Sequence, residues 1–516
     1  MERLVHHRKK DTGVTYVYKI VEEYWDKDRK QMRNKQICLG KLDPLTGELI
    51  PSKRLDKTPP PVPTASTIVI GPTMVLSKVA RDIGLEATLK QAFPTAWEQI
   101  LTLSYFLVST GDALIHGDAW CRNHEVPADG SYADQRLSEW LSNITEDGCQ
   151  SFFKAWNKHI SEKEYLCYDI TSISSYSELN EYVRYGYNRD KESLPQINLA
   201  MVYGQKSGLP VTYRFLPGAI SDVSSIKKLL SVFDKLEYPH MNLVLDRGFY
   251  SRQNVTELLN KRYHFIIGLK SDRSWVRSII DECQDALVSP RGYRQMDMDS
   301  LYMHTKPVQW EENNRRCYVH IYYNPHRAVD DFENMIKHLV CCKDELESGR
   351  TNPSNQEDYK KYFIVKETPV RGRSVEYNDD AIRNYRNKYA GFFAIMSTKK
   401  MDAMECLQVY RDKDVVEKAF DDLKNSLDMK RLRIHTSGRM AARFFVQFVS
   451  LILRNGMQKT MRETNLSERY SPKLLLGELE SLTKIHYTGK YKDIISEVTK
   501  SQREILTAFG IDPNTL

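Results

Sequence analysis

The order of apolar segments between Tyr165 and Lys270 most constrains the fold of this chain. Three segments with strand character come first, and then a predicted helix, a strand, a second helix and a final strand. Helices inserted between short strands act as crossovers, so the sequence predicts an α/β domain with a mixed sheet flanked by helices. The segments are 165–174, 197–203, 211–216, 223–233, 241–246, 251–261 and 264–270.

This element order is that of a ribonuclease H-like domain, which has three layers around a mixed sheet. Residues 271–390 interrupt the domain with further strand-like and helical runs, and they predict an α+β insertion subdomain. The strand GFFAIMST, which begins at Gly391, leads back into the first domain. This α/β domain is therefore predicted to span 161–270 and 391–460.

Four further segments flank this domain. Residues 1–57 carry 14 Lys and Arg and nine Asp and Glu, a net charge of +5, and they alternate as strands do around Val14–Glu23. Such a basic β module could dock on DNA phosphates or be a solvated hairpin. Residues 58–68 predict a Pro-rich linker, 69–160 a helical module that is a candidate for DNA binding, and 461–516 a helical region that is a candidate for dimerisation.

The bulk composition excludes several classes of protein. A hydrophobic content of 41% is enough for a core and excludes a disordered chain. The nine cysteines include no CxxC pair, which indicates a reduced cytoplasmic protein without a structural zinc site. The N-terminus has no apolar run, so no signal peptide is predicted, and Phe444–Leu453 is too short to span a membrane.

Positive charge is concentrated a second time between Lys424 and Lys459. This segment holds eight Lys and Arg but only one acid, Asp428, so its net charge of +7 equals that of the whole chain. Segregation of this kind favours a DNA-facing surface. A solvated helix with apolar residues beneath it is compatible with the same pattern.

The segment YRDKDVVEKAFDDLK, from Tyr410 to Lys424, predicts one helix, because it has no Gly or Pro and many helix formers. At about 100° per residue, Tyr410, Lys413, Glu417 and Lys424 share a stripe about 60° wide. An aromatic ring, two ammonium groups and a carboxylate on one face suit a surface that holds a divalent metal and grips a phosphate backbone. A solvated, charged helix edge is the alternative.

Three carboxylates are candidates for one catalytic site. Asp169 lies within an apolar strand, Asp246 ends the fourth strand, where α/β sheets present functional groups, and Glu417 comes from the helix stripe. Three acids brought together repel one another unless cations intervene, which predicts two Mg²⁺ or Mn²⁺ ions. On helix geometry alone Asp414 or Asp421 could replace Glu417.

The pattern Tyr410-x2-Lys413-x3-Glu417-x6-Lys424 resembles the YREK signature of bacterial insertion-sequence DDE transposases. The runs VLDRGFYS around Asp246 and YDITSIS around Asp169 are similar to the other two motifs of that family. One departure is that a lysine stands at the Arg position of the signature, which keeps the charge but loses the bidentate fork.

The resemblance implies that Asp169, Asp246 and Glu417 bind the metals and that Tyr410, Lys413 and Lys424 contact the DNA backbone. Relatives stack an aromatic residue of the insertion on a flipped base, which makes Trp310 a candidate, with ordinary packing as the alternative. Arg247 is a candidate for phosphate contact or for a salt bridge.

The resemblance also implies a DNA transposase of the cut-and-paste type, which cleaves transposon ends and transfers the 3′-hydroxyl into target DNA. Its expected partners are double-stranded DNA (terminal inverted repeats and target) and a second copy of the chain in a synaptic homodimer. Its expected location is the bacterial cytoplasm, with the nucleoid. The competing interpretations are a metal-dependent nuclease of the same fold without strand transfer, and a non-catalytic DNA-binding relative.

Overall fold

The computed structural model describes most of the chain and divides it into two compact units. One unit is Met1–Thr67 with Ile485–Ile494, and the other is Ile68–Lys484 with Ile495–Leu516. Most of the predicted linker, residues 58–64, lies outside the described residues, as does Arg433 of the basic segment. The described residues are 3–26, 29–52, 65–130, 132–159, 164–177, 180–235, 241–296, 299–368, 372–432, 437–487 and 492–516.

The first unit contains an antiparallel four-stranded sheet in the order β1-β2-β3-β4. The strand predicted around Val14–Glu23 is confirmed as β2, which pairs with β3 along most of its length. Val17 is the buried apolar side chain of this sheet, so its core is small. The strands are β1 (Leu4–Arg8), β2 (Thr15–Asp26), β3 (Gln31–Leu42) and β4 (Leu49–Pro51).

The second unit is built on a mixed sheet in the order β11-β12-β13-β16-β10-β9-β6-β7-β8, with β17 pairing on β6. The strands β6, β9 and β10 run parallel to one another, whereas β7, β8 and β16 are antiparallel to their neighbours. The strands are β6 (Tyr165–Ser175), β7 (Gln196–Gly204), β8 (Pro210–Pro217), β9 (Asn242–Leu245), β10 (His264–Leu269), β11 (Tyr293–Met296), β12 (Asp299–Trp310), β13 (Arg315–Tyr323), β16 (Phe392–Ser397) and β17 (Arg431–Leu432).

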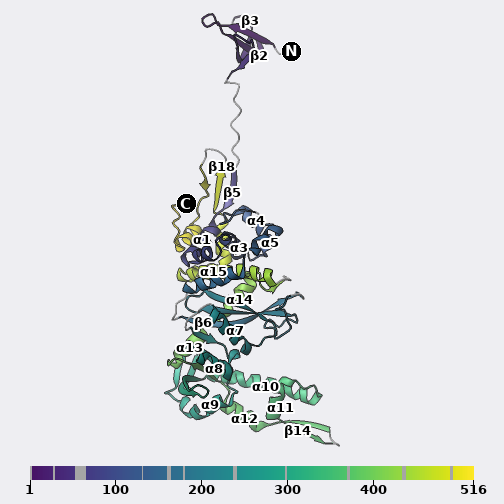
Figure 1. Ribbon diagram of the computed structural model, residues 1–516, viewed down its shortest axis with the longest axis vertical. Coiled ribbons are helices and arrows are strands. Elements are labelled where there is room, and N and C mark those ends of the chain that lie inside the picture. Colours follow the sequence, from purple (N-terminus) through teal and green to yellow (C-terminus); the bar gives the residue numbers. More distant parts are fainter. Residues whose placement is uncertain are drawn as a thin grey trace. The chain divides into compact units, whose positions relative to one another are not determined.

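Helices flank both faces of this sheet, which confirms the predicted mixed α/β class and the predicted order of elements. The crossover helices α7 (Asp222–Lys235) and α8 (Arg252–Asn260) separate β8, β9 and β10 along the chain. In Figure 1, α14 (Asp414–Ser426) and α7 lie on opposite sides of β6. Every residue of β7 is buried, as expected for a strand covered on both faces.

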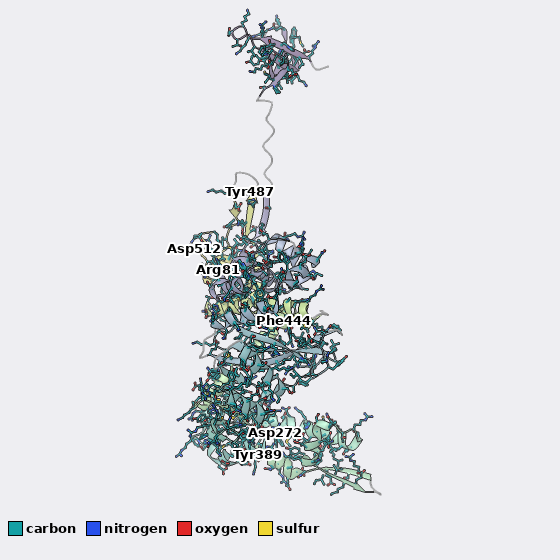
Figure 2. All side chains as sticks on the ribbon, viewed as in Figure 1. Arg81, Asp272, Tyr389, Phe444, Tyr487 and Asp512 are labelled. Carbon is teal, nitrogen blue, oxygen red and sulfur yellow. The ribbon has the colours of Figure 1, made fainter. Side chains whose placement is uncertain are left out.

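The longest helix, α15 (Ser437–Glu463), passes through the core between the sheet and the N-terminal helices. Phe444, Phe445 and Phe448 on this helix are fully buried, and Figure 2 labels Phe444. The helical module predicted for 69–160 consists of α1 (Gly71–Asp82), α2 (Leu85–Ala92), α3 (Trp97–Thr110), η1 (Leu114–His116), α4 (Gly117–Asn123), α5 (Asp134–Ser142), α6 (Glu146–Trp156) and η2 (Asn157–His159).

The segment 271–390 is partly continuous with the main sheet, because β13 pairs with β16 and so brings β11 and β12 into it. The rest of the segment has an apolar cluster of its own, which includes Leu339, Tyr362 and Val375. The elements of this segment outside the main sheet are α9 (Ser274–Leu287), α10 (Pro325–Ser348), η4 (Pro353–Asn355), α11 (Gln356–Tyr362), β14 (Phe363–Thr368), β15 (Gly372–Tyr377) and α12 (Asp379–Lys388).

The C-terminal region is not purely helical, contrary to the prediction for 461–516. It contains two strands, and one of them pairs with β5 in a three-stranded sheet of order β19-β18-β5. Within the described residues, no helix has the length and apolar character needed to cross a membrane. The elements are β5 (Ala65–Val69), η5 (Leu466–Glu468), α16 (Pro472–Leu479), β18 (Thr483–Tyr487), β19 (Ile494–Ile495) and α17 (Lys500–Ala508).

Candidate active site

Asp169 and Asp246 lie on adjacent parallel strands. Tyr168 of β6 pairs with Leu245 of β9, so the two aspartates are the next residues along each strand. Side chains at matched positions of parallel neighbours point to the same face, with the strands about 4.8 Å apart. The fold therefore holds two carboxylates side by side, one within a buried strand and one at the end of its neighbour.

The surroundings of Asp169 disfavour the ionised form of its carboxyl group. Burial raises the pKa of Asp169 to about 6, and the Asp246 carboxylate also raises it. The hydrogen bond that the Ile170 amide donates to Asp169 Oδ1, at 2.8 Å, acts in the opposite direction, as do the charges of Lys413 and Arg189. The raised pKa of Asp169 thus comes mainly from burial, with the neighbouring Asp246 carboxylate as a smaller cause.

The segment Tyr410–Lys424 is not one helix, contrary to the prediction. The helix α13 (Ala403–Arg411) ends and α14 begins after it, with Lys413 as the N-cap residue of α14. The carbonyl of Val409 accepts a hydrogen bond of 2.7 Å from Gln205 Nε2. The Lys413 amide donates instead to the Tyr410 carbonyl at 3.4 Å, which makes a turn between the two helices.

Tyr410, at the end of α13, contacts the second acid, Asp246. Tyr410 Oη donates a hydrogen bond of 2.7 Å to Asp246 Oδ1. Burial and the charge of Asp246 raise the pKa of Tyr410, so this hydroxyl stays protonated. Gly268 of β10 makes room for the ring, because a Cβ at that position would lie 2.4 Å from Tyr410 Oη. The prediction missed Gly268, although a glycine inside an apolar strand often marks a close approach.

Lys413 lies among the three predicted acids. Its Nζ is 3.2 Å from Glu417 Oε1 and 3.9 Å from Asp246 Oδ1, and its side chain is 17% exposed. Burial lowers the pKa of Lys413, but Asp246, Glu417 and Asp169 together raise it above its ordinary value. A single ammonium group therefore balances carboxylates that come from β6, from the end of β9 and from α14.

Lys424, a predicted DNA contact, pairs with an acid of this chain. Its Nζ contacts both carboxylate oxygens of Asp190, at 2.7 and 2.8 Å, and its side chain is largely buried. Asp190 belongs to the segment between β6 and β7, in which the neighbouring Arg189 forms an ion pair with Asp222. Sequence reasoning missed both residues, because neither lies in a recognisable motif.

The other two predicted DNA contacts differ from each other. Arg247 is exposed, directly follows Asp246 and has no ion pair among the described residues, so the salt-bridge alternative is not observed. Trp310 is 4% exposed, and its Nε1 donates a hydrogen bond of 2.9 Å to Thr256 Oγ1. Its ring packs edge-to-face against Trp275. These contacts favour the packing alternative for Trp310, because they leave no ring face open to a base.

The donor set suits a hard divalent cation, since it consists of carboxylate oxygens. As the side chains lie, however, no group of three or more His, Cys, Asp or Glu within the described part of the chain is close enough to hold a metal ion. The Lys413 ammonium provides the positive charge between Asp246 and Glu417. Asp169 and Asp246 would supply carboxylates from matched positions of adjacent strands, and Glu417 would have to release Lys413 to join them.

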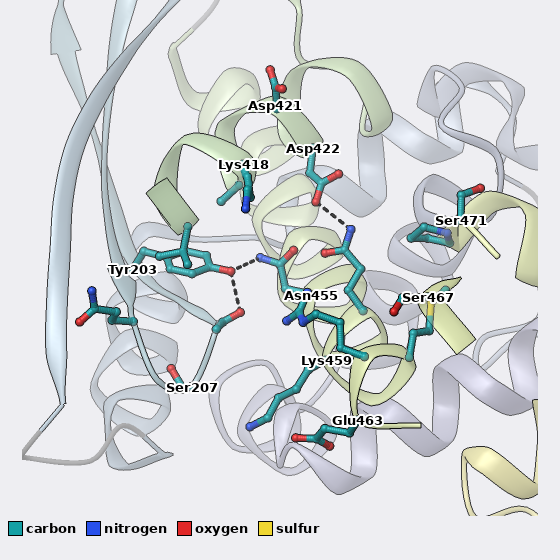
Figure 3. A pocket seen from close by; sticks show the side chains of 18 of the residues that line it. Tyr203, Ser207, Lys418, Asp421, Asp422, Asn455, Lys459, Glu463, Ser467 and Ser471 are labelled. Carbon is teal, nitrogen blue, oxygen red and sulfur yellow. Dashed lines mark hydrogen bonds between the residues drawn. The ribbon is translucent and has the colours of Figure 1, made fainter. Parts of the chain in front are cut away.

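A groove of about 870 Å³ lies along another face of α14 (Figure 3). Lys206, Lys418, Lys459 and Arg462 line it and have no ion pairs among the described residues. Asp421, the alternative third acid, also lines this groove and accepts a hydrogen bond from Asn425. Asp421 therefore lines the groove, whereas Glu417 contacts Lys413.

The basic segment Lys424–Lys459 is largely neutralised by acids. Of its seven described Lys and Arg, four form ion pairs, which are Lys424–Asp190, Arg431–Glu192, Arg443–Asp428 and Arg454–Asp422. Three of these acids lie outside the stretch whose charge was counted. The net charge of +7 in the sequence therefore overstates the positive surface of this segment.

Comparisons with known proteins identify the family of this chain. A family model described as "Transposase DDE domain" matches residues 160–453, which is more than half of the chain and includes all three acids. One solved structure, described as a cryo-EM structure of the piggyBac transposase synaptic complex with hairpin DNA, is 10% identical. The similarity covers 80% of this chain and 77% of that chain, with a TM-score of 0.36. No curated protein matches this chain.

Proposed function

Because this chain belongs to the family of the transposase DDE domain, we propose that it is a DNA transposase that cleaves transposon ends and joins the freed 3′-hydroxyl to target DNA. The proposal rests on the adjacent positions of Asp169 and Asp246. Lys413 lies between Asp246 and Glu417, so the third acid belongs to the same site. The proposed location is the bacterial cytoplasm, at the nucleoid.

Asp169, Asp246 and Glu417 are the proposed catalytic and metal-binding residues. Two Mg²⁺ or Mn²⁺ ions, when bound, would activate a water or a 3′-hydroxyl and stabilise the leaving oxygen. The raised pKa of Asp169 supports this assignment, because an added positive charge would favour its ionised form. Before DNA arrives, Tyr410 orients Asp246 through its hydrogen bond.

Tyr410, Lys413, Lys424 and Arg247 are the proposed contacts to the DNA backbone. The donors of Tyr410, Lys413 and Lys424 each contact a carboxylate oxygen. A phosphate offers the same kind of acceptor, so the three donors can exchange a carboxylate for a phosphate when DNA arrives. Arg247 requires no exchange, because it is exposed beside Asp246.

The predicted domains remain part of the proposal. Five strands in the order β8-β7-β6-β9-β10, with the helices around them, are the proposed ribonuclease H-like core of the catalytic domain, 161–270 and 391–460. The β module 1–57 and the helical module 69–160 are the proposed DNA-binding segments, and 271–390 is the proposed insertion. The region 461–516 is a proposed dimer contact, since two transposon ends require two copies of the site.

A substitution at Glu417 tests the catalytic assignment. We expect Glu417→Gln to abolish Mg²⁺-dependent strand cleavage while binding to transposon ends stays intact, because the amide removes a negative oxygen donor but keeps the shape. Asp421→Asn, in the groove on another face of α14, is the matched control and should cleave normally. Full activity of Glu417→Gln would reject the assignment.

Two alternative functions are separated by further measurements. A metal-dependent nuclease of the same fold would cleave the ends but would not insert labelled ends into a supercoiled plasmid. A non-catalytic DNA-binding relative would bind neither Mg²⁺ nor Mn²⁺ at the three acids, which a calorimetric titration detects. Plasmid integration by the wild-type chain excludes both.

A further inference from the structure

Two tyrosines in the segment between β6 and β7 are unusually exposed. Tyr185 is 74% exposed and Tyr187 is 82% exposed, the highest values for Phe, Trp and Tyr residues in the described part of the chain. Within the described residues, neither ring packs against another aromatic ring or a cation. Large aromatic surface left in water next to a functional site often marks a place where a partner binds.

The backbone that carries these tyrosines is nevertheless well held. Arg184 and Gln196 exchange two backbone hydrogen bonds of 3.0 Å, and Gln196 Nε2 donates to the Tyr187 carbonyl at 2.8 Å. Gly186 packs so closely that a Cβ there would lie 2.1 Å from the Gly218 carbonyl oxygen. The chain has therefore already ordered the backbone of this segment, which lowers the entropy cost of binding through its side chains.

The same segment is anchored beside the proposed catalytic acids. The Arg189 amide donates to Ser172 Oγ at 3.3 Å, and Ser172 lies three residues after Asp169 on β6, which is about 10 Å along a strand. The next residue, Asp190, accepts both contacts from Lys424 of α14. The two tyrosines thus belong to a loop that follows the strand of the first acid and contacts the helix of the third.

We propose that Tyr185 and Tyr187 form a stacking surface for unpaired DNA bases beside the scissile phosphate. The inference rests on the proposed function, because it assumes that DNA reaches Asp169 and Asp246. Aromatic faces stack on any base, but a base within a duplex has its faces covered by its neighbours. The rings would therefore engage nucleotides of a cut or opened end rather than intact duplex. Trp310, the aromatic predicted for such a role, has no open face.

Binding measurements on the full chain test this inference without catalysis. Fluorescence anisotropy in EDTA would compare a blunt duplex with the same duplex carrying a short single-stranded overhang. The wild type should prefer the overhang, and Tyr185→Ala/Tyr187→Ala should bind the overhang about tenfold more weakly while it binds the blunt duplex as before. Tyr185→Phe/Tyr187→Phe keeps both rings and should keep the preference.

Tyr293→Ala is the matched control, because Tyr293 is a 40% exposed tyrosine on β11, at the opposite edge of the main sheet from β8. Unchanged overhang binding by the double alanine variant would overturn the inference, as would equal losses in the phenylalanine variant or in Tyr293→Ala. A wild type that binds neither DNA would reject the proposed function as well. Melting curves check that the variants fold.

Discussion

At the scale of single residues, the site depends on one ammonium group. Lys413 contacts Glu417 and Asp246 directly and lies within electrostatic reach of Asp169. Without it, Asp246 and Glu417 would lose the cation that they share. In the DNA-free chain Lys413 thus supplies the positive charge that we propose divalent cations supply during the reaction.

Replacing Lys413 by Met should destabilise the chain by about 1–3 kcal/mol at neutral pH in EDTA, because partly buried carboxylates lose their counter-charge. Added Mg²⁺ or Mn²⁺ should recover more of the melting temperature in this variant than in the wild type. Thermal melting with and without metal measures both effects. Lys418→Met, on the groove face of α14, is the control, and equal metal responses in both variants would contradict the role of Lys413.

A second residue-scale prediction concerns Gly268. Replacing it by Ala should lower the free energy of unfolding by about 1–3 kcal/mol, because the new Cβ would overlap Tyr410 Oη. Removing that oxygen in Gly268→Ala/Tyr410→Phe should recover part of the loss. Urea unfolding of the single and double variants gives the coupling energy. Strictly additive effects would show that the two residues do not interfere with each other.

At the scale of elements, two long-range hydrogen-bond systems determine local geometry. Gln205 Nε2 donates a hydrogen bond to the Val409 carbonyl, which the Lys413 amide would use in a continuous helix, and so α13 and α14 are separate.

In the sheet, His320 of β13 lies between Thr305 of β12 and Ser397 of β16. Ser397 Oγ donates its proton to the Lys399 carbonyl, so it accepts from His320 Nε2, and Thr305 donates to Nδ1. A neutral imidazole can make both hydrogen bonds, because one ring nitrogen accepts from Thr305 and the other donates to Ser397.

His320 makes stability depend on pH. Burial lowers its pKa to about 4, although the charge of Asp402 raises it by a smaller amount. Below the ordinary pKa of about 6.5 the unfolded chain binds a proton that the folded chain does not, so stability falls as pH decreases from 6.5 to 4. The loss should reach about 3 kcal/mol.

Urea unfolding at pH 7 and pH 5 measures this dependence. In His320→Gln the side chain can still donate and accept but cannot be protonated, so the variant should lose less stability at pH 5 than the wild type. Other groups titrate in the same range, and the difference between the two chains isolates His320. Parallel pH profiles would contradict the prediction.

At the scale of the whole molecule, the distribution of charge matters more than its sum. Four cations of the basic segment Lys424–Lys459 form ion pairs. Among the described residues, Lys459 of this segment and two further groove cations, Lys206 and Arg462, form none. Cations without acidic partners can release counterions from DNA at the lowest cost. The groove is therefore the better candidate for sequence-independent contact with a DNA backbone.

Charge reversal tests the groove. Lys206→Glu/Lys459→Glu should weaken binding to a duplex of arbitrary sequence and reduce the slope of log K against log salt by about one per lost phosphate contact. Lys337→Glu on α10, where Lys337 already pairs with Glu333, is the control. A salt slope equal to that of the wild type would show that DNA does not enter the groove.

The sequence alone determined the order of strands and helices from β6 to β10 and the mixed α/β class, because buried apolar periodicity is a local property of the chain. It also placed Asp169 within one of these strands and Asp246 at the end of another, whereas the register that brings them side by side came from the structure. Tertiary contacts decided the rest: Gln205 breaks the helix predicted around Tyr410, Thr256 and Trp275 enclose Trp310, and distant acids neutralise the basic segment. These partners are far apart in the sequence, so no local pattern could reveal them.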